Sequence, residues 1–293
     1  MKNRLGLSVH PWWINGEIDK LEDELNTIES AGADYAELVL HALDVVIGGR
    51  IVPARQKQVK AILKRHSLRY TLHLPYDLNL LHTEVGTLYE GVFHAGIEFA
   101  QEAGCELIVY HAGVAAGDPR QLLEKEVSIL HWLLDFAGDL PLCMENGPFY
   151  SPAEYSMGSS AAKMAAFCRQ IDRPNFRLTF DAGHSFMSNL ADASAMLADL
   201  ETVLPFVGHI HLHDNLGIPI QMEYSNYSHR IACGAADIHL PLGWGGIPLP
   251  DVLARLQGYD GIVVLEIEKR FEDQYAQCLE FVRGFEAHRR ELL

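Results

Sequence analysis

Residues 207–215 read VGHIHLHDN, and this short stretch sets the class of fold that we expect. Its apolar residues and its histidines alternate with a period of two, which is the period of a β-strand. His209, His211 and His213 therefore face one side of the strand, and Ile210 and Leu212 face the other. Seven further runs of similar length recur along the chain, so the question becomes how these strands are connected.

The short apolar runs alternate with segments of helical spacing from one end of the chain to the other. The runs lie at residues 5–9, 35–40, 69–74, 106–111, 142–146, 177–181, 207–213 and 261–268. The helical segments lie at about 18–32, 53–65, 83–104, 119–137, 159–171, 191–204, 249–257 and 272–290. Such alternation predicts an α/β fold, a (β/α)₈ TIM barrel, with a doubly wound open sheet as the alternative.

Domain organisation follows from the absence of any linker-like or low-complexity segment in the sequence. We expect one domain over residues 1–293, with two long connections at 41–53 and 214–247. Both connections follow a predicted strand. In a barrel they would lie on the face where the carboxyl ends of the strands build active sites.

Composition narrows the classes of function. The 293 residues are 48% hydrophobic with a net charge of −16, so a generally basic surface for nucleic acid is excluded, although bound cations can reverse the sign locally. The five cysteines form no CxxC pair and predict buried, reduced thiols. Because the sequence shows no signal-peptide core and no apolar run of membrane-spanning length, we expect a cytoplasmic protein that does not bind membranes.

Residues of the types that bind metals gather at the ends of the predicted strands and in the loop after the seventh. Each has a structural interpretation by itself, such as a helix cap for Glu145 or Asp181. Together they would place unpaired carboxylates and repelling imidazoles at one level of a barrel, which divalent cations resolve. Mixed imidazole and carboxylate ligands favour Zn²⁺, with Mn²⁺ or Fe²⁺ as alternatives, and nine candidates are enough for two or three ions. They are His73, His111, Glu145, Asp181, His184, His211, Asp237, His239 and Glu266.

The order of the motifs resembles that of the xylose isomerase-like barrels, and within them most closely endonuclease IV, AP endonuclease family 2. The motifs are HLPYDLNL (73–80), YHAG (110–113), MENG (144–147), FDAGHSF (180–186), IHLHDN (210–215), DIHLPLGWG (237–245) and LEIE (265–268). The resemblance implies a trinuclear zinc site. It assigns His73 and His111 to one ion, Asp181, His211 and Glu266 to a second, and His184, Asp237 and His239 to a third, with Glu145 bridging the first two.

The motifs differ in how well they separate branches of this superfamily. Its sugar isomerases and epimerases share the residue types at Glu145, Asp181, His211 and Glu266, where they hold a single metal. His73, His111, Asp237 and His239 are the residues that point to the nuclease branch. The chain also departs from the nucleases, because its connection 41–53 is apolar with one arginine and His213 stands where they have asparagine.

Three functions follow as hypotheses. The first is a metal-dependent phosphodiester hydrolase of the endonuclease IV type, in which a metal-activated hydroxide attacks abasic DNA or a small phosphodiester and Glu145 or Glu266 acts on the water. The second is a single-metal isomerase or epimerase of sugars or sugar phosphates, in which the same two glutamates move protons. The third is a barrel that only binds ligands. The oligomeric state stays open.

Four residues are candidates for contacting the substrate: Tyr76, His213, Arg230 and Trp12. Tyr76 matches a tyrosine that lies at the DNA lesion in the nucleases. Trp12 and the neighbouring Trp13 either stack on a ring or pack at the barrel mouth. The segment 214–236, with Tyr224, Tyr227, His229 and Arg230, is either a substrate lid or a solvated loop. Of the histidine ladder, we expect His209 to be structural, His211 to bind metal, and His213 to face the substrate or support a ligand.

Overall fold

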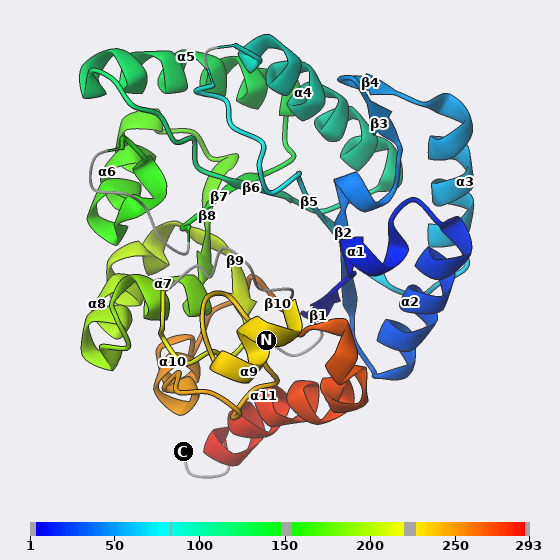
Figure 1. The fold of residues 1–293 in the computed structure, drawn as a ribbon, viewed down its shortest axis with the longest axis vertical. Coiled ribbons are helices and arrows are strands. Elements are labelled where there is room, and N and C mark those ends of the chain that lie inside the picture. The colour runs from blue at the N-terminus through cyan, green and yellow to red at the C-terminus, as the bar shows by residue number, and fades with distance from the viewer. Residues whose placement is uncertain (1–3, 83, 148–153, 220–226, 291–293) are drawn as a thin grey trace.

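The computed structural model describes residues 4–82, 84–147, 154–219 and 227–290. Eight parallel strands form its centre: β1 (Leu5–Ser8), β2 (Tyr35–Val39), β5 (Arg69–His73), β6 (Ile108–His111), β7 (Leu142–Glu145), β8 (Phe176–Asp181), β9 (Val207–Leu212) and β10 (Ile262–Leu265). They close into a barrel in the order β1-β10-β9-β8-β7-β6-β5-β2, and Figure 1 shows helices around this ring. The predicted (β/α)₈ barrel is confirmed, and the open-sheet alternative is wrong.

The described helices are α1 (Pro11–Ile14), α2 (Ile18–Ser30), α3 (Pro53–Leu63), α4 (Gly86–Ala103), α5 (Pro119–Ala137), α6 (Ala161–Ile171), α7 (Ala182–Ser188), α8 (Ala193–Val203), α9 (Tyr227–Cys233), α10 (Leu249–Arg255) and α11 (Tyr275–Arg290). Eight of them follow the predicted segments closely, and α1, α7 and α9 lie outside those segments. Helix α5 begins where Asp118 accepts a hydrogen bond from the Arg120 backbone, and α4 ends at Gly104, whose φ is +75°. Among the described helices, none is both long and apolar enough to cross a membrane.

The connection 41–53 is a small hairpin rather than an open loop. Strands β3 (Val46–Ile47) and β4 (Arg50–Ile51) pair antiparallel across Gly48 and Gly49, which both have positive φ. Two successive residues with positive φ are typical of the tight turns that join paired antiparallel strands. A 3₁₀ turn, η1 (Leu40–Ala42), links β2 to the hairpin and leaves His41 at the barrel mouth.

The inside of the barrel changes character from bottom to top. Its lower part holds a separate apolar cluster of Tyr35, Leu107, Val109, Cys143, Ile262 and Val264. Above this cluster the inward positions are polar and buried, for example Glu37, Thr71 and His209. The outer faces of the strands carry the main core, packed against the helices. The apolar floor and the helical layer leave only the carboxyl-terminal face for chemistry.

Strands β8 and β9 pair with an irregular register. Leu178 lies opposite Val207, but Thr179 lies opposite His209, so Gly208 has no partner on β8. The extra residue makes a β-bulge. Beyond it, Asp181 pairs with His211, which places these two metal-type side chains at the same level of the barrel.

A buried carboxylate on α5 provides a test of the fold that is independent of the site. Glu126 accepts a hydrogen bond of 2.8 Å from the Tyr155 hydroxyl, and burial raises the pKa of Glu126 to about 7. Since this value lies above the usual 4.5, the folded protein keeps a proton that the unfolded chain releases. The contribution of Glu126 to stability is therefore fully present below the unfolded pKa and is lost as the pH rises through 7.

We expect Glu126→Gln to flatten this dependence, because glutamine stays neutral and still accepts from Tyr155. Between about pH 4.5 and 7, the free energy of unfolding of the wild type should fall by roughly 3 kcal/mol relative to that of the variant. Urea unfolding at several pH values measures the difference. An equal gap between the two proteins throughout would contradict a raised Glu126 pKa.

Candidate metal centre and substrate cavity

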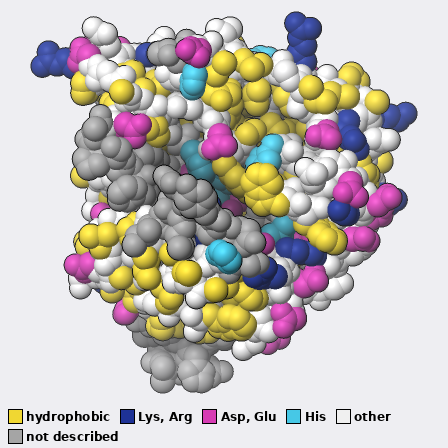
Figure 2. Space-filling model, viewed as in Figure 1, with side chains coloured by type: hydrophobic (Ala, Val, Ile, Leu, Met, Phe, Trp, Pro, Cys, Tyr) yellow, Lys and Arg dark blue, Asp and Glu magenta, His cyan; other side chains and the backbone are white. Residues whose placement is uncertain are grey.

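A cavity of about 300 Å³ opens at the carboxyl ends of the strands. Seven of the nine predicted metal-type residues line it: His73, His111, Glu145, His184, Asp237, His239 and Glu266. The other two, Asp181 and His211, are wholly buried. On the face seen in Figure 2, histidine side chains gather around the centre of the molecule. The fold thus brings all nine residues to one region.

Four of the nine residues form the central cluster, which we define as Glu145, Asp181, His211 and Glu266. Their ligand atoms all lie within 4.8 Å of one another. The Nδ1 of His211 lies 3.1 Å from Glu145 Oε1, 3.5 Å from Glu266 Oε2 and 3.8 Å from Asp181 Oδ2. One imidazole nitrogen thus faces three carboxylates from different strands, which is a donor set for one divalent cation.

Two further groups of possible ligands flank the central cluster. On one side, the Nε2 atoms of His73 and His111 lie 3.1 and 3.3 Å from the same oxygen of Glu145. On the other side, Asp237 Oδ2 lies 2.7 Å from His239 Nε2 and 3.2 Å from His184 Nε2.

The flanking groups share side chains with the central cluster. Glu145 belongs to the His73 and His111 group, and Asp181 forms a further possible ligand set with His184 and His213. Glu145 and Asp181 would therefore be available to two neighbouring groups of ligands each.

The histidines are held as metal ligands are commonly held. The Nδ1 atoms of His73, His184 and His239 lie 2.6, 2.8 and 2.9 Å from the backbone carbonyl oxygens of Leu74, Asn146 and Glu266. If each Nδ1–H donates there, each Nε2 turns a lone pair toward the carboxylates. Anchoring of the second ring nitrogen is usual for a metal-binding histidine. The chemistry of the donor set therefore fits divalent cations.

Several buried polar atoms at the site lack a hydrogen-bond partner among the described residues. They include Asp181 Oδ2, Asp237 Oδ1 and both ring nitrogens of His213. Leaving such atoms unsatisfied inside a protein is costly, and a charged carboxylate is the costliest of them. Bound cations would satisfy the two carboxylate oxygens.

Charge coupling keeps the acids of the site ionised. Burial opposes ionisation, yet His211 and His111 hold the pKa of Glu145 well below its usual value. Burial likewise disfavours the charged form of His239, but Asp237 raises the pKa of His239 to about 10. The ionised carboxylates are stabilised by positive charge nearby. Either protonated imidazoles or bound metal ions can supply that charge.

The three histidines of β9 and its end have three different surroundings. His209 Nε2 lies 2.9 Å from Glu37 deep in the barrel, and His211 belongs to the central cluster. His213 is also wholly buried: its Nε2 lies 3.3 Å from Asp181 and 3.4 Å from Asp237. Its ring stacks on that of His239, with centroids 4.1 Å apart. The structure therefore places His213 among the possible ligands, behind the cavity wall.

Asp214 fixes the loop that carries Asp237 and His239. Its carboxylate accepts hydrogen bonds from the backbone N–H groups of Gly243 and Ile247, and its backbone pairs with Leu240. His239 itself has a φ of +45°, a conformation that costs energy for a residue with a side chain. The loop therefore holds this histidine against its backbone preference, so that Nε2 meets Asp237.

The mouth of the cavity is aromatic. Tyr76 packs edge-on against both His41 and His73 with centroid distances of 4.9 Å, and Trp12, which is 79% exposed, lies beside His41. Burial and the nearby His73 lower the pKa of His41 to about 4, so this ring is neutral. Arg230, from α9, brings a positive charge to the cavity wall. Three of the four predicted substrate residues, Trp12, Tyr76 and Arg230, thus line the cavity, whereas His213 is buried and does not.

Part of the proposed lid segment 214–236 can be placed. Its helix α9 carries Arg230 to the cavity, and in Figure 1 it lies over the ends of β9 and β10. Tyr224 lies outside the described residues.

The sequence analysis missed Glu37 and His41. The signal for Glu37 is a single carboxylate inside the apolar run YAELVL, at a position where a strand would bury it. His41 follows the same strand directly, on the edge where the other candidates lie.

Solved structures of similar fold span almost the whole chain. One is a D-tagatose 3-epimerase-like protein, 22% identical, with a TM-score of 0.73 and coverage of 99% of this chain and 100% of that one. Another is a D-psicose 3-epimerase from Clostridium cellulolyticum H10 with D-tagatose, 16% identical, with a TM-score of 0.71 and coverage of 96% and 99%. A protein from Thermus thermophilus soaked with ZnCl₂ is 21% identical, with a TM-score of 0.66 and coverage of 97% and 98%. No curated protein matches the chain.

These comparisons overturn the phosphodiester hydrolase predicted from the sequence. The similar structures include several sugar 3-epimerases, which favours the isomerase or epimerase alternative. The error has a physical origin. Metal-ligand motifs report which ions a barrel can hold, whereas the substrate is selected by the loops around them.

The sequence matches the xylose isomerase-like TIM barrel family over residues 25–285, which is most of the chain. This match agrees with the closed eight-stranded barrel and with the placement of the motifs at its carboxyl-terminal face. The chain belongs to the xylose isomerase-like TIM barrel family.

Proposed function

We propose that the protein is a metal-dependent sugar epimerase or isomerase that moves a proton at the carbon beside a carbonyl group. One observation carries this proposal: Glu145 and Glu266 both reach the cavity, and both face the same nitrogen of His211. Two carboxylates around one donor set can serve two faces of one sugar carbon. The sugar 3-epimerases of similar fold support this choice of substrate.

The chemistry needs one base and one acid. One glutamate takes the proton from the carbon next to the carbonyl, which leaves an enediolate. The other glutamate returns a proton to the opposite face of that carbon, and the configuration inverts. The lowered pKa of Glu145 keeps its carboxylate ionised, which is the form that accepts a proton. A divalent cation in the central cluster would polarise the carbonyl and stabilise the developing negative charge.

We propose two or three ions in all. The central cluster holds one, with Glu145, Asp181, His211 and Glu266 as its ligands. The group of His73 and His111 with Glu145 offers a second site. Asp237, whose Oδ2 lies near both His184 Nε2 and His239 Nε2, offers a third. Zn²⁺ is the first candidate for these mixed ligands, with Mn²⁺ and Fe²⁺ next.

Around the ions, Trp12, Tyr76 and Arg230 are proposed to bind the sugar. Tyr76 stays a neutral hydrogen-bond donor because burial and the neighbouring Glu266 raise its pKa well above the ordinary value. His213 is proposed to support the site from behind, through Asp181 and Asp237. We further propose that the chain works as one domain in the cytoplasm, since all five cysteines are free thiols.

Hydrogen exchange tests the proposal directly. The protein is incubated in D₂O with D-tagatose, D-psicose, D-fructose or L-ribulose and one of the three metals, and NMR follows deuterium entering the carbon beside the carbonyl. We expect exchange together with inversion for at least one ketose. Absence of exchange in every ketose and metal combination would overturn the proposal.

Trp12 provides a test of substrate binding. Covering roughly 50 Å² of the apolar face of a sugar at about 25 cal/mol per Å² stabilises the complex by about 1.3 kcal/mol, or about tenfold in affinity. We expect Trp12→Ala to raise KM by about that factor with kcat nearly unchanged. Trp132, which is half-exposed on α5, provides the control. Equal KM values for Trp12→Ala and Trp132→Ala would remove Trp12 from the binding site.

A further inference from the structure

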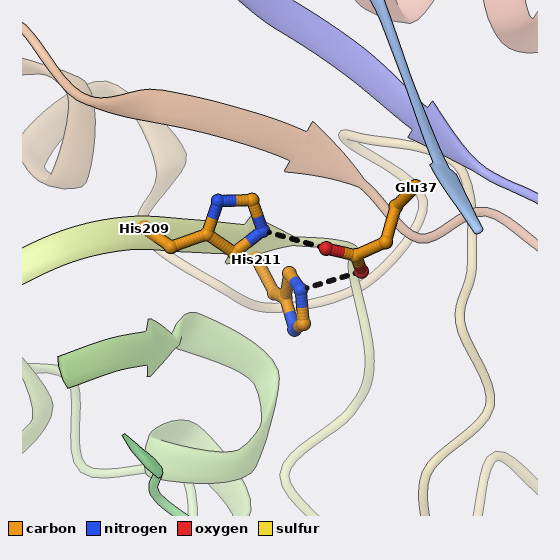
Figure 3. A group of neighbouring side chains, drawn as sticks. All are labelled: Glu37, His209 and His211. Carbon is orange, nitrogen blue, oxygen red and sulfur yellow. Dashed lines mark ion pairs between the residues drawn. The ribbon is translucent and has the colours of Figure 1, made fainter. Parts of the chain in front are cut away.

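Glu37 is a wholly buried carboxylate in the middle of β2, one level below the metal-type cluster. Its Oε2 lies 2.9 Å from His209 Nε2 and accepts a hydrogen bond of 2.9 Å from the Thr71 hydroxyl. Its Oε1 lies 2.9 Å from His211 Nε2. Figure 3 shows the carboxylate reaching across the barrel interior to both imidazoles. One carboxylate thus joins the structural histidine to the proposed metal ligand.

This trio is better suited to holding His211 than to binding an ion. The ligand atoms of Glu37, His209 and His211 lie within 4.8 Å of one another, as those of the other groups do. The Thr71 hydroxyl, however, already donates a hydrogen bond to the Glu37 oxygen that faces His209. The trio also lies below the cavity, whose lining includes none of its three residues.

His211 differs from the other histidines in how its second nitrogen is anchored. His73, His184 and His239 each have Nδ1 beside a backbone carbonyl. His211 instead has Nε2 beside Glu37, and its Nδ1 faces the central cluster. If the imidazole proton lies on Nε2, which is 2.9 Å from the carboxylate, the lone pair lies on Nδ1. A carboxylate partner also makes that lone pair more basic than a carbonyl partner does.

We propose that Glu37 is a positioning residue that fixes the tautomer and the ring orientation of His211, and so strengthens the metal site of the central cluster. The meaning of this role for catalysis rests on the proposed function, whereas the role itself rests on geometry. His209 and Thr71 complete the arrangement, because they hold the Glu37 carboxylate in place from its other oxygen.

Metal affinity is the readout that a purely structural role would leave unchanged. The full chain is freed of metal with a chelator and titrated with Co²⁺, while calorimetry gives Kd and stoichiometry and visible absorption reports the ligand geometry. We expect Glu37→Gln to weaken the Co²⁺ Kd roughly 10- to 100-fold at one site, with the number of sites unchanged. Glu126→Gln removes another buried carboxylate and should bind Co²⁺ like the wild type.

A second variant covers the case in which Glu37→Gln does not fold. Thr71→Val keeps the shape of the side chain and removes only the hydroxyl that fixes Glu37, so we expect a Kd weakened by a smaller factor. An unchanged Kd in the folded variant overturns the proposal. Loss of one whole Co²⁺ equivalent with the other sites intact also overturns it, because Glu37, His209 and His211 would then hold an ion themselves.

The outcome is separable from that of the proposed function. If no sugar exchanges hydrogen but Glu37→Gln weakens Co²⁺ binding, the positioning role stands and the epimerase proposal fails. If a sugar is epimerised and the Co²⁺ affinity of the variant matches that of the wild type, the reverse holds.

Discussion

Replacing Glu145 or Glu266 by glutamine is expected to slow epimerisation by roughly 10²- to 10⁴-fold, the usual contribution of general acid–base catalysis. Glutamine keeps the size of the side chain and its carbonyl oxygen, but it cannot carry a proton between the sugar and the solvent. Both carboxylates line the cavity, and both are at most 8% exposed, so water cannot readily replace them.

The two variants should fail in complementary ways. Each keeps one carboxylate, which still removes and returns a proton on its own face of the sugar. Deuterium should therefore enter one epimer without inversion in Glu145→Gln and the other epimer in Glu266→Gln. Glu268→Gln is the matched control, because Glu268 lines the same cavity outside the proposed metal clusters. Wild-type rates of inversion in both variants would exclude the two-carboxylate mechanism.

Removal of metal is expected to abolish activity and to lower Tm by roughly 10 °C. A ligand present at about 1,000 times its Kd stabilises a protein by about 4 kcal/mol, and each kcal/mol shifts the Tm of a chain of this size by about 2–4 °C. Without cations, Asp181 Oδ2 and Asp237 Oδ1 are buried atoms with no hydrogen-bond partner among the described residues. Thermal unfolding with EDTA, and after adding back Zn²⁺, Mn²⁺ or Fe²⁺, measures the effect.

Elemental analysis of protein purified without chelator completes this test. We expect two or three equivalents of metal, and a lower content in His111→Ala and in Asp237→Ala, which each remove a ligand from a different flanking group. Protein that contains no metal and has the same Tm with and without EDTA would contradict a metal centre.

The barrel and its strand ends could be predicted because their signals are local. A barrel strand is buried by the barrel interior on one face and by helices on the other, so it is short and largely apolar. Its last residues lie at the carboxyl-terminal mouth of the barrel. The eight strands all lie within the predicted runs or close to their limits. His73, His111, Glu145 and Asp181 each end a strand, so their common level follows from the closure of the barrel.

Other features depend on contacts between residues far apart in the sequence, which no local pattern predicts. Glu37 meets His209 and His211 only because the closed barrel brings β2 toward β9, although the two strands are not neighbours. The short helices α1, α7 and α9 lie within connections that follow strands, outside the segments of helical spacing. Substrate choice rests on loop geometry, and this is why the prediction of a hydrolase was wrong.

The bulge at Gly208 has a consequence for how this strand tolerates changes in length. Because β9 and its end repeat histidine at every second place, a slip by two residues would still present an imidazole at two of the three depths. A slip by one residue would instead turn Ile210 and Leu212 inward and the imidazoles outward. Gly208 lies unpaired between two regular pairs, Val207 opposite Leu178 and His209 opposite Thr179. Deletion of Gly208 itself would therefore remove the bulge and leave both pairs in place, whereas deletion of one residue after His209 would turn the following histidines away from the barrel interior.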